Sequence, residues 1–117
     1  MIHHVSLETR RADVDAAVAF WALLGFERVD PPDALVERAT WVQRAGTQIH
    51  LLHAEDPVVM PQGHVAVHAE DYDAALERLR AAGFEPEARR EHWGSPRSYV
   101  RSPGGHLVEV FAFPPPA

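Results

Sequence analysis

Cysteine is absent from the 117-residue chain, and its absence restricts the chemistry that the protein can carry. Disulfides, thiolate metal sites and a cysteine nucleophile are excluded, so any metal must be bound by imidazole and carboxylate groups. The chain also lacks a run of about 18 apolar residues, and it lacks a basic N-terminal segment followed by an apolar one. These absences predict a soluble, cytoplasmic protein.

Clusters of basic residues are absent as well. The 17 acidic residues outnumber the 11 basic ones and give a formal charge of −6 at pH 7. Nucleic acid and anionic membranes are therefore poor candidates for partners. The length suits one domain spanning residues 1–117, and the 46% hydrophobic content is enough to form its core.

Three landmarks of the first half recur in the second half at nearly one spacing. The motif His4-Val5-Ser6-Leu7 recurs as His64-Val65-Ala66-Val67, an offset of 60 residues (4 to 64). The Gly-Phe-Glu triplet at residue 25 recurs at residue 83 (offset 58), and the position of His50 corresponds to that of Glu109 (offset 59). Such a steady offset predicts a duplicated structural unit with small differences in loop length.

Each copy predicts a strand, a helix and three further strands. Asp13 and Asp71 are placed to cap the two helices, and Gly25 and Gly83 are placed to end them in the left-handed conformation. The later strands are expected at residues 26–29, 37–43 and 47–53, and again at 84–87, 98–101 and 106–113. The predicted fold class is α+β, with two tandem βαβββ modules, residues 1–55 and 64–113, joined by a linker at residues 56–63.

Alternation along the first and last strands of each copy places possible metal ligands opposite the apolar residues that pack on the helices. His4 and His50 share this face in the first copy, and His64 and Glu109 share it in the second. If the copies lie side by side, their mostly antiparallel sheets form a curved cup with the helices on its outer face, and the four side chains converge inside. Imidazole with one carboxylate suits divalent Fe, Mn, Co, Ni or Zn, which predicts a metal site without identifying the metal.

Five segments in this order resemble the vicinal oxygen chelate superfamily, which includes glyoxalases, bleomycin resistance proteins and extradiol dioxygenases. The segments are His4-Val5-Ser6-Leu7, Phe20-Trp21 before Leu24-Gly25-Phe26, Ile49-His50-Leu51, Gly63-His64-Val65-Ala66-Val67 and Gly105-His106-Leu107-Val108-Glu109-Val110. The resemblance covers nearly the whole chain and implies that His4, His50, His64 and Glu109 bind the metal. His50 is a departure, because glyoxalases commonly have Glu or Gln at this position, and it leaves the reaction open.

The resemblance implies a metal that chelates a substrate through vicinal oxygens and stabilises negative charge on them. Four protein ligands leave an octahedral ion room for two substrate oxygens, which favours lyase or isomerase chemistry with Glu109 as proton acceptor. If His50 does not bind, His4, His64 and Glu109 form the triad typical of Fe(II) oxygenases, and an extradiol-type dioxygenase is the alternative. A non-catalytic drug or metabolite binding protein of the bleomycin-resistance type is the alternative of another class.

Four further side chains are expected to rim the cup and contact a small-molecule substrate: Trp41, Trp93, Arg97 and Tyr99. Arg97 suits an anionic group such as carboxylate or phosphate. The resemblance also implies a homodimer, with the cup formed either within one chain or across the interface.

Overall fold

Both predicted copies fold into the same series of elements. The computed structural model describes residues 1–117 and divides into two units, Met1–Val59 (unit 1) and Met60–Ala117 (unit 2). Each unit contains a strand, a helix and three further strands, and its strands form one four-stranded sheet. The predicted α+β fold of tandem βαβββ modules is confirmed.

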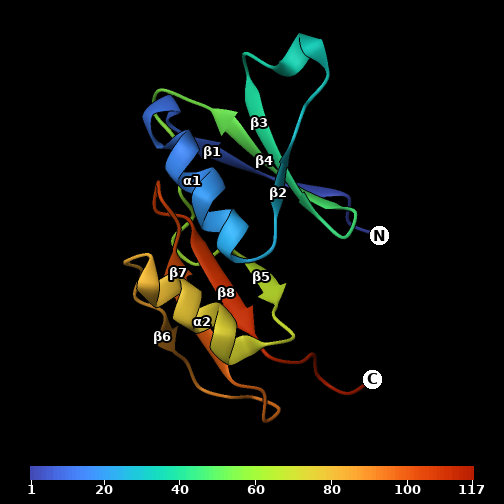
Figure 1. Cartoon of the computed structure of the whole chain (residues 1–117), viewed down its shortest axis with the longest axis vertical. Coiled ribbons are helices and arrows are strands. Elements are labelled where there is room, and N and C mark those ends of the chain that lie inside the picture. Colours follow the sequence, from blue (N-terminus) through green and yellow to red (C-terminus); the bar gives the residue numbers. More distant parts are fainter. The chain divides into compact units, whose positions relative to one another are not determined.

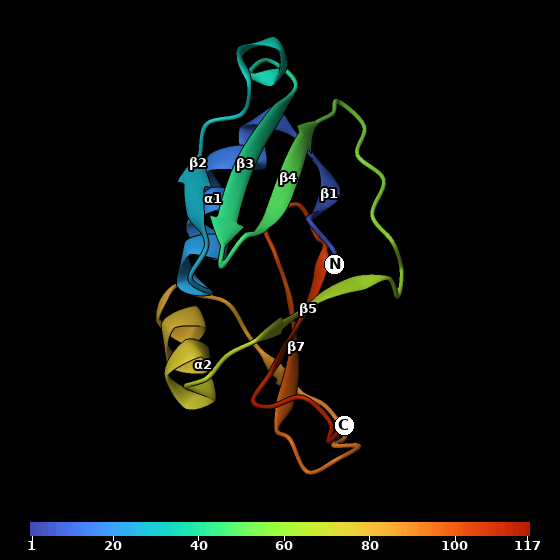
Figure 2. The ribbon, with the colours of Figure 1, turned by 90° about the vertical axis from the view of Figure 1, so that its right-hand side faces the viewer.

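Unit 1 forms a mixed sheet with the strand order β1-β4-β3-β2. Strands β1 and β4 pair in parallel, and the other two pairings are antiparallel. The four strands and the helix are visible in Figures 1 and 2. The elements are β1 (His4–Thr9), α1 (Arg11–Leu23), β2 (Glu27–Val29), a 3-10 helix (Asp33–Leu35), β3 (Ala39–Arg44) and β4 (Thr47–His53).

Unit 2 repeats this arrangement with the strand order β5-β8-β7-β6. Its first strand also pairs in parallel with its last, and the other pairings are again antiparallel. The elements are β5 (His64–His68), α2 (Tyr72–Ala81), β6 (Glu87–Ala88), β7 (Arg97–Arg101) and β8 (Leu107–Phe111).

The helix of each unit covers one face of its own sheet. Helix α1 contacts β2, β3 and β4, and it buries Phe20 and Trp21 completely (0% exposed). Helix α2 lies against the second sheet (Figure 1), buries Leu79 completely, and contacts β7 through a 2.6 Å hydrogen bond between the hydroxyls of Tyr72 and Ser98. The opposite face of each sheet carries no helix of its unit, and we call it the helix-free face.

The two helices begin differently. Asp71 caps α2 as predicted, because its carboxylate accepts a hydrogen bond from the amide of Ala74 (3.1 Å). The prediction that Asp13 caps α1 is wrong. Helix α1 begins at Arg11, its N-cap residue is Arg10 without a side-chain bond, and Asp13 lies in the first turn, where its amide donates to the carbonyl of Arg10.

The helix ends and one tight turn use left-handed backbone. Gly25 (φ 90°) and Gly83 (φ 93°) follow α1 and α2, as the sequence predicts. Ala45 (φ 49°) and Gly46 (φ 81°) connect β3 to β4 in the two-residue hairpin turn that requires positive φ at both positions.

One predicted strand is shifted. Phe84 belongs to the turn that closes α2, since its amide donates to the carbonyl of Leu79, and β6 therefore begins only at Glu87. Residues 54–63, between β4 and β5, form neither helix nor strand. None of the helices has the length and apolar character needed to span a membrane.

Candidate functional site

The predicted site residues that belong to strands lie on the helix-free faces. In unit 2, Ser98 contacts α2, so the alternating residues Arg97 and Tyr99 point to the other face. Tyr99 pairs with Glu109 across β7 and β8, and Trp41 pairs with His50 across β3 and β4. The alternation of side chains along each strand therefore predicted the correct sheet face for these residues.

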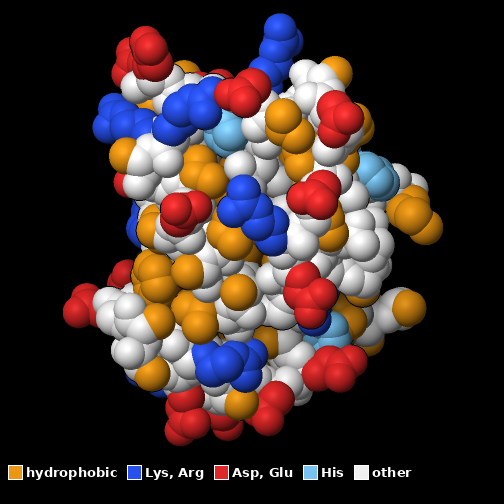
Figure 3. Space-filling view, turned by 45° about the horizontal axis from the view of Figure 1, so that its top comes forward, with side chains coloured by type: hydrophobic (Ala, Val, Ile, Leu, Met, Phe, Trp, Pro, Cys, Tyr) orange, Lys and Arg blue, Asp and Glu red, His pale blue; other side chains and the backbone are white.

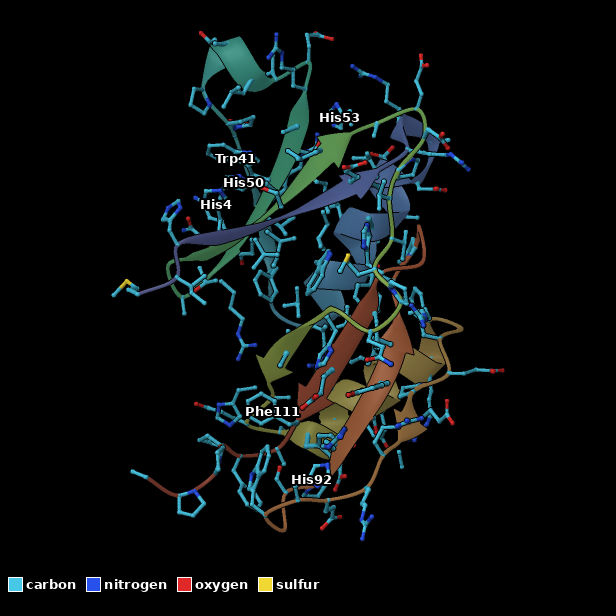
Figure 4. All side chains as sticks on the ribbon, turned by 180° about the vertical axis from the view of Figure 1, so that it is seen from behind. His4, Trp41, His50, His53, His92 and Phe111 are labelled. Carbon is cyan, nitrogen blue, oxygen red and sulfur yellow. The ribbon has the colours of Figure 1, made fainter.

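In unit 1 three rings form a stack. The ring of His50 lies parallel to that of His4 (3.9 Å between centroids, 13° between planes) and to that of Trp41 (4.0 Å, 2°). Since β4 lies between β1 and β3, His50 is held between the two other rings. Figure 4 shows His4, His50 and Trp41 close together, with His53 further along β4.

A chain of hydrogen bonds fixes the tautomer of His50. The amide nitrogen of Gln48 donates to the side-chain oxygen of Gln43 (2.8 Å), which leaves the Gln48 oxygen to accept from Nε2 of His50 (2.8 Å). Nε2 then carries the proton, and Nδ1 has the free lone pair. Burial lowers the pKa of His50, and the neighbouring His4 and His3 lower it further, so the ring is neutral at pH 7.

The stacked geometry prevents His4 and His50 from binding one metal ion together. A metal lies in the plane of each imidazole that binds it, at about 2.1 Å from the nitrogen. Two nearly parallel rings with centroids 3.9 Å apart do not share such a point. Joint binding requires one ring to turn about its side-chain bonds.

In unit 2 the structure brings the other two predicted ligands together. Nε2 of His64 lies 3.2 Å from Oε1 of Glu109, a buried carboxylate. Nδ1 of His64 lies 2.8 Å from the backbone carbonyl of Gln62, which only accepts, so Nδ1 carries the proton. Nε2 therefore presents a lone pair to a carboxylate oxygen, and the pair requires a cation, either a second proton or a metal ion.

This arrangement fits the donor set of a metal site. Histidines that bind metals usually donate their second ring N–H to a backbone carbonyl or carboxylate, which fixes the tautomer and the orientation of the ring. His64 has this partner in Gln62, and Glu109 supplies the oxygen ligand. No group of three or more His, Asp or Glu side chains gathers in metal-binding geometry, so each unit presents a pair of candidate ligands.

Arg97 and Tyr99 flank the His64–Glu109 pair on β7. The side chain of Arg97 is 11% exposed, and its Nη1 lies 4.0 Å from Oε1 of Glu109. The rings of Tyr99 and His64 are 5.2 Å apart, and the guanidinium carbons of Arg97 and Arg89 lie 5.1 and 5.0 Å from the Tyr99 ring centre. The predicted substrate contacts Arg97 and Tyr99 are thus next to the predicted ligands of their unit.

A pocket of about 500 Å³ opens beside this group within unit 2. His64 and Tyr99 line it together with Gln62, Arg89 and Arg101. Trp93 lies apart from the pocket lining, in the loop before β7, where its indole N–H donates to the carbonyl of Phe113 (2.8 Å).

Sequence reasoning missed the residues that orient the candidate ligands. Gln48 lies two residues from His50 on the same strand face, so alternation was enough to find it. Gln62 acts through its backbone carbonyl, which leaves no signal in the sequence. Arg89, which stacks on the predicted substrate contact Tyr99, lies in a loop where no periodicity indicates which way a side chain points.

Comparison with known proteins identifies the class. Residues 1–110 match the family model described as the Glyoxalase/Bleomycin resistance protein/Dioxygenase superfamily, and the chain belongs to this superfamily. A search of curated protein sequences finds no match.

Solved structures of the same family share the fold. A glyoxalase family protein from Bacillus anthracis has a TM-score of 0.84 at 21% identity, with 95% of this chain and 93% of that chain covered. Lactoylglutathione lyase from Agrobacterium tumefaciens has a TM-score of 0.72 at 26% identity, with 95% and 92% covered. The fosfomycin resistance protein FosX from Listeria monocytogenes has a TM-score of 0.78 at 21% identity, with 97% and 93% covered.

Proposed function

We propose that the protein is a divalent-metal-dependent enzyme that performs lyase or isomerase chemistry on a small substrate chelated through vicinal oxygens. The observation that carries this proposal is the His64–Glu109 pair, in which Nε2 of His64 lies 3.2 Å from Oε1 of Glu109. A bound divalent ion supplies Lewis-acid stabilisation of negative charge on the substrate oxygens.

The proposed ligand set is His4, His50, His64 and Glu109. Gln62 orients His64 for this role through its carbonyl. Binding by His50 additionally requires its ring to leave the stack with His4 and Trp41. The metal is Zn, Ni, Co, Mn or Fe, all of which accept imidazole and carboxylate ligands.

Glu109 is the proposed proton acceptor. Its carboxylate takes a proton from the substrate carbon beside the chelating oxygens and returns it to the neighbouring position, which completes an isomerisation without a further reactant. Glu109→Gln is expected to abolish turnover while part of the metal is retained. Normal turnover in this variant with full metal content excludes the role.

An Fe(II) extradiol-type dioxygenase is the second candidate, and the geometry of His50 favours it. Nε2 of His50 is hydrogen-bonded to Gln48, and its ring is stacked between two others. If His50 stays in this position, His4, His64 and Glu109 are the ligands, and a two-histidine, one-carboxylate triad leaves room for dioxygen beside the substrate.

The test is the metal content per chain, measured by elemental mass spectrometry on untagged protein reconstituted with each candidate metal. The variants are His64→Ala and His50→Ala. His68→Ala is the matched control, because His68 lies on the same strand as His64 with its ring stacked on Phe111. The wild type and the control are expected to hold about one ion per chain.

The outcomes separate the candidates. Loss of metal in both His64→Ala and His50→Ala supports the four-ligand enzyme, to be assayed with hemithioacetals and acyl-CoA epimers. Loss only in His64→Ala supports the triad, to be assayed by oxygen consumption. A wild type that binds no metal contradicts both enzymes and favours a ligand-binding protein, and sedimentation of the same samples tests the proposed homodimer.

A further inference from the structure

Two buried side-chain nitrogens of the molecule have no hydrogen-bond partner, and both lie on helix-free faces. They are Nε1 of Trp41 on β3 and Nη1 of Arg97 on β7. Buried polar atoms are almost always hydrogen-bonded, so an unpartnered donor needs a specific explanation. Both atoms are donors, and both therefore lack an acceptor.

The unpartnered donor of Arg97 belongs to the guanidinium, which carries a full positive charge. The side chain is 11% exposed, and its nearest counter-charge is Oε1 of Glu109, at 4.0 Å from Nη1, beyond hydrogen-bond distance. The other terminal nitrogen, Nη2, donates only a long bond of 3.4 Å to Nε2 of His92. Besides these contacts the guanidinium only stacks on the Tyr99 ring. Keeping a largely buried cation with an unpartnered donor is costly, and an anion that accepts from Nη1 removes this cost.

We propose that Arg97 binds the carboxylate of the substrate, and that the substrate is a 2-hydroxy or 2-oxo acid. This inference rests on the proposed function, because it assumes that Glu109 binds the ion that chelates the substrate. Arginine suits the role, since its planar fork matches the two oxygens of a carboxylate.

The position of Arg97 determines the class of acid. Nη1 lies 4.0 Å from the carboxylate oxygen that we propose as a metal ligand, so an anion bound to Nη1 must lie directly beside the chelating oxygens. A 2-hydroxy or 2-oxo acid meets this condition, because one carboxylate oxygen and the oxygen on the next carbon are vicinal. An acid whose carboxylate is several carbons away cannot contact both groups.

The surroundings leave room for the remainder of such a molecule. A pocket of about 500 Å³ is lined by His64 and Tyr99, the neighbours of Glu109 and Arg97, and we infer that the carbon chain extends into it. Acidic and basic side chains are interspersed on the surface seen in Figure 3. On the helix-free face of unit 2, the largely buried Arg97 supplies the positive charge next to Glu109.

The experiment measures binding of oxalate, a stable probe with two vicinal carboxylate oxygens, and of oxamide, its neutral isostere. Titration calorimetry is performed on metal-loaded wild type, Arg97→Gln and Arg97→Lys. Arg80→Gln is the matched control, because it removes the same charge from an exposed position on α2, on the other side of the sheet. Thermal unfolding and metal content are recorded for each sample.

We expect Arg97→Gln to weaken oxalate binding about 10- to 100-fold, the usual range for a hydrogen bond to a charged group, and to leave oxamide binding unchanged. Arg97→Lys is expected to recover part of the loss, and Arg80→Gln to bind like the wild type. Equal oxalate affinity in folded, metal-loaded Arg97→Gln and wild type overturns the inference.

The inference can fail separately from the proposed function. If Arg97→Gln does not fold, two other measurements test the inference: oxalate binding by Arg97→Lys, and the preference of the wild type for oxalate over oxamide. If Arg97→Lys binds oxalate like the wild type and the wild type shows no preference for oxalate, the inference is overturned. If the wild type binds no metal, the proposed function fails. In that case, oxalate binding by the metal-free wild type that is lost in Arg97→Gln still supports a carboxylate site at Arg97. If the metal-free wild type does not bind oxalate at all, the carboxylate site at Arg97 is overturned too.

Discussion

The two units share a backbone plan and differ in the chemistry of their helix-free faces. Trp41 pairs with His50 in unit 1 in the same register as Tyr99 pairs with Glu109 in unit 2. The face of unit 1 carries uncharged rings and amides that stack and hydrogen-bond with one another, with Nε1 of Trp41 left without a partner. The face of unit 2 carries two groups that are usually charged, the Glu109 carboxylate and the Arg97 guanidinium, whose Nη1 has no hydrogen-bond partner. A duplicated scaffold thus fixes where side chains point and allows each copy to specialise.

The units also differ in the side chains that their helices bury against the sheets. This difference gives the largest expected effect on stability. Trp21 is completely buried in unit 1 and contacts Phe20 and Phe26 edge to face, with ring centres 5.3 and 5.2 Å apart. At the equivalent position of unit 2, 58 residues later, stands Leu79. We expect Trp21→Ala to lower the free energy of unfolding by about 3–5 kcal/mol, measured by urea denaturation, because it removes the larger buried side chain and leaves a cavity.

Leu79→Ala is the control for this comparison, with an expected loss of about 2–5 kcal/mol. A larger loss for Trp21→Ala supports a core of unit 1 that depends on aromatic packing. Equal losses contradict it and indicate that the surrounding structure collapses equally well in both units.

Replacing a residue of unit 1 by its counterpart in unit 2 tests how much the hydrogen bonds on the helix-free face of unit 1 contribute to stability. Gln48 corresponds to Leu107 of unit 2, 59 residues later. Gln48→Leu leaves Nε2 of buried His50 and the side chain of Gln43 without their partner. We expect a loss of about 1–3 kcal/mol in the free energy of unfolding, the usual range for an unsatisfied buried polar group.

The same substitution in a His50→Phe background isolates the bond. Phenylalanine keeps a ring in the stack but has no nitrogen to satisfy, so Gln48→Leu is expected to cost less there. If the cost is the same in both backgrounds, the hydrogen bond to Gln48 does not hold His50, and the ring is free to turn towards a metal.

The sequence was sufficient to predict the fold because the signals were local and repeated. Periodicity, the helix-closing glycines and the constant offset gave both units, and strand alternation gave the face of every candidate residue on a strand. It was not sufficient to predict what the side chains do on that face. The ring stack of His50 depends on rotamers, and the orientation of His64 depends on a backbone carbonyl.

The prediction for Asp13 was wrong for a similar reason. Asp13 and Asp71 both precede an apolar helical stretch, but only Asp71 is the N-cap residue of its helix. In unit 1 the turn falls three residues earlier, at Arg10, whose extended backbone (φ −64°, ψ 143°) begins the helix without a side-chain cap. Cap geometry depends on the path of the preceding strand, which sequence pattern does not specify.

The two helix starts provide a smaller test of the comparison. Asp71→Ala removes the bond to the amide of Ala74 and is expected to lower the free energy of unfolding by about 1 kcal/mol. Asp13→Ala removes only a charge from the first turn and is expected to cost about 0.3–1 kcal/mol at low salt and less at high salt. Urea denaturation at two salt concentrations separates them, and a cost for Asp71→Ala that salt eliminates contradicts the cap.

The smallest expected effect is the pH dependence that His50 gives to unit 1. Burial, with His4 and His3 nearby, lowers the pKa of His50 below its ordinary value of 6.5 in the folded state. Between the pKa of His50 in the folded state and its ordinary value of 6.5, the unfolded chain binds more protons than the folded one, so the free energy of unfolding rises with pH. The contribution of the neutral His50 to stability is therefore fully present above pH 6.5 and is lost as the pH falls through this range. The equivalent position of unit 2 is occupied by Glu109. Denaturation of metal-free wild type and His50→Phe from about pH 7.5 to about pH 5 measures this contribution, because phenylalanine keeps the ring and does not titrate. The wild type is expected to lose stability relative to His50→Phe as the pH falls, and parallel curves contradict the assignment of a neutral, buried His50.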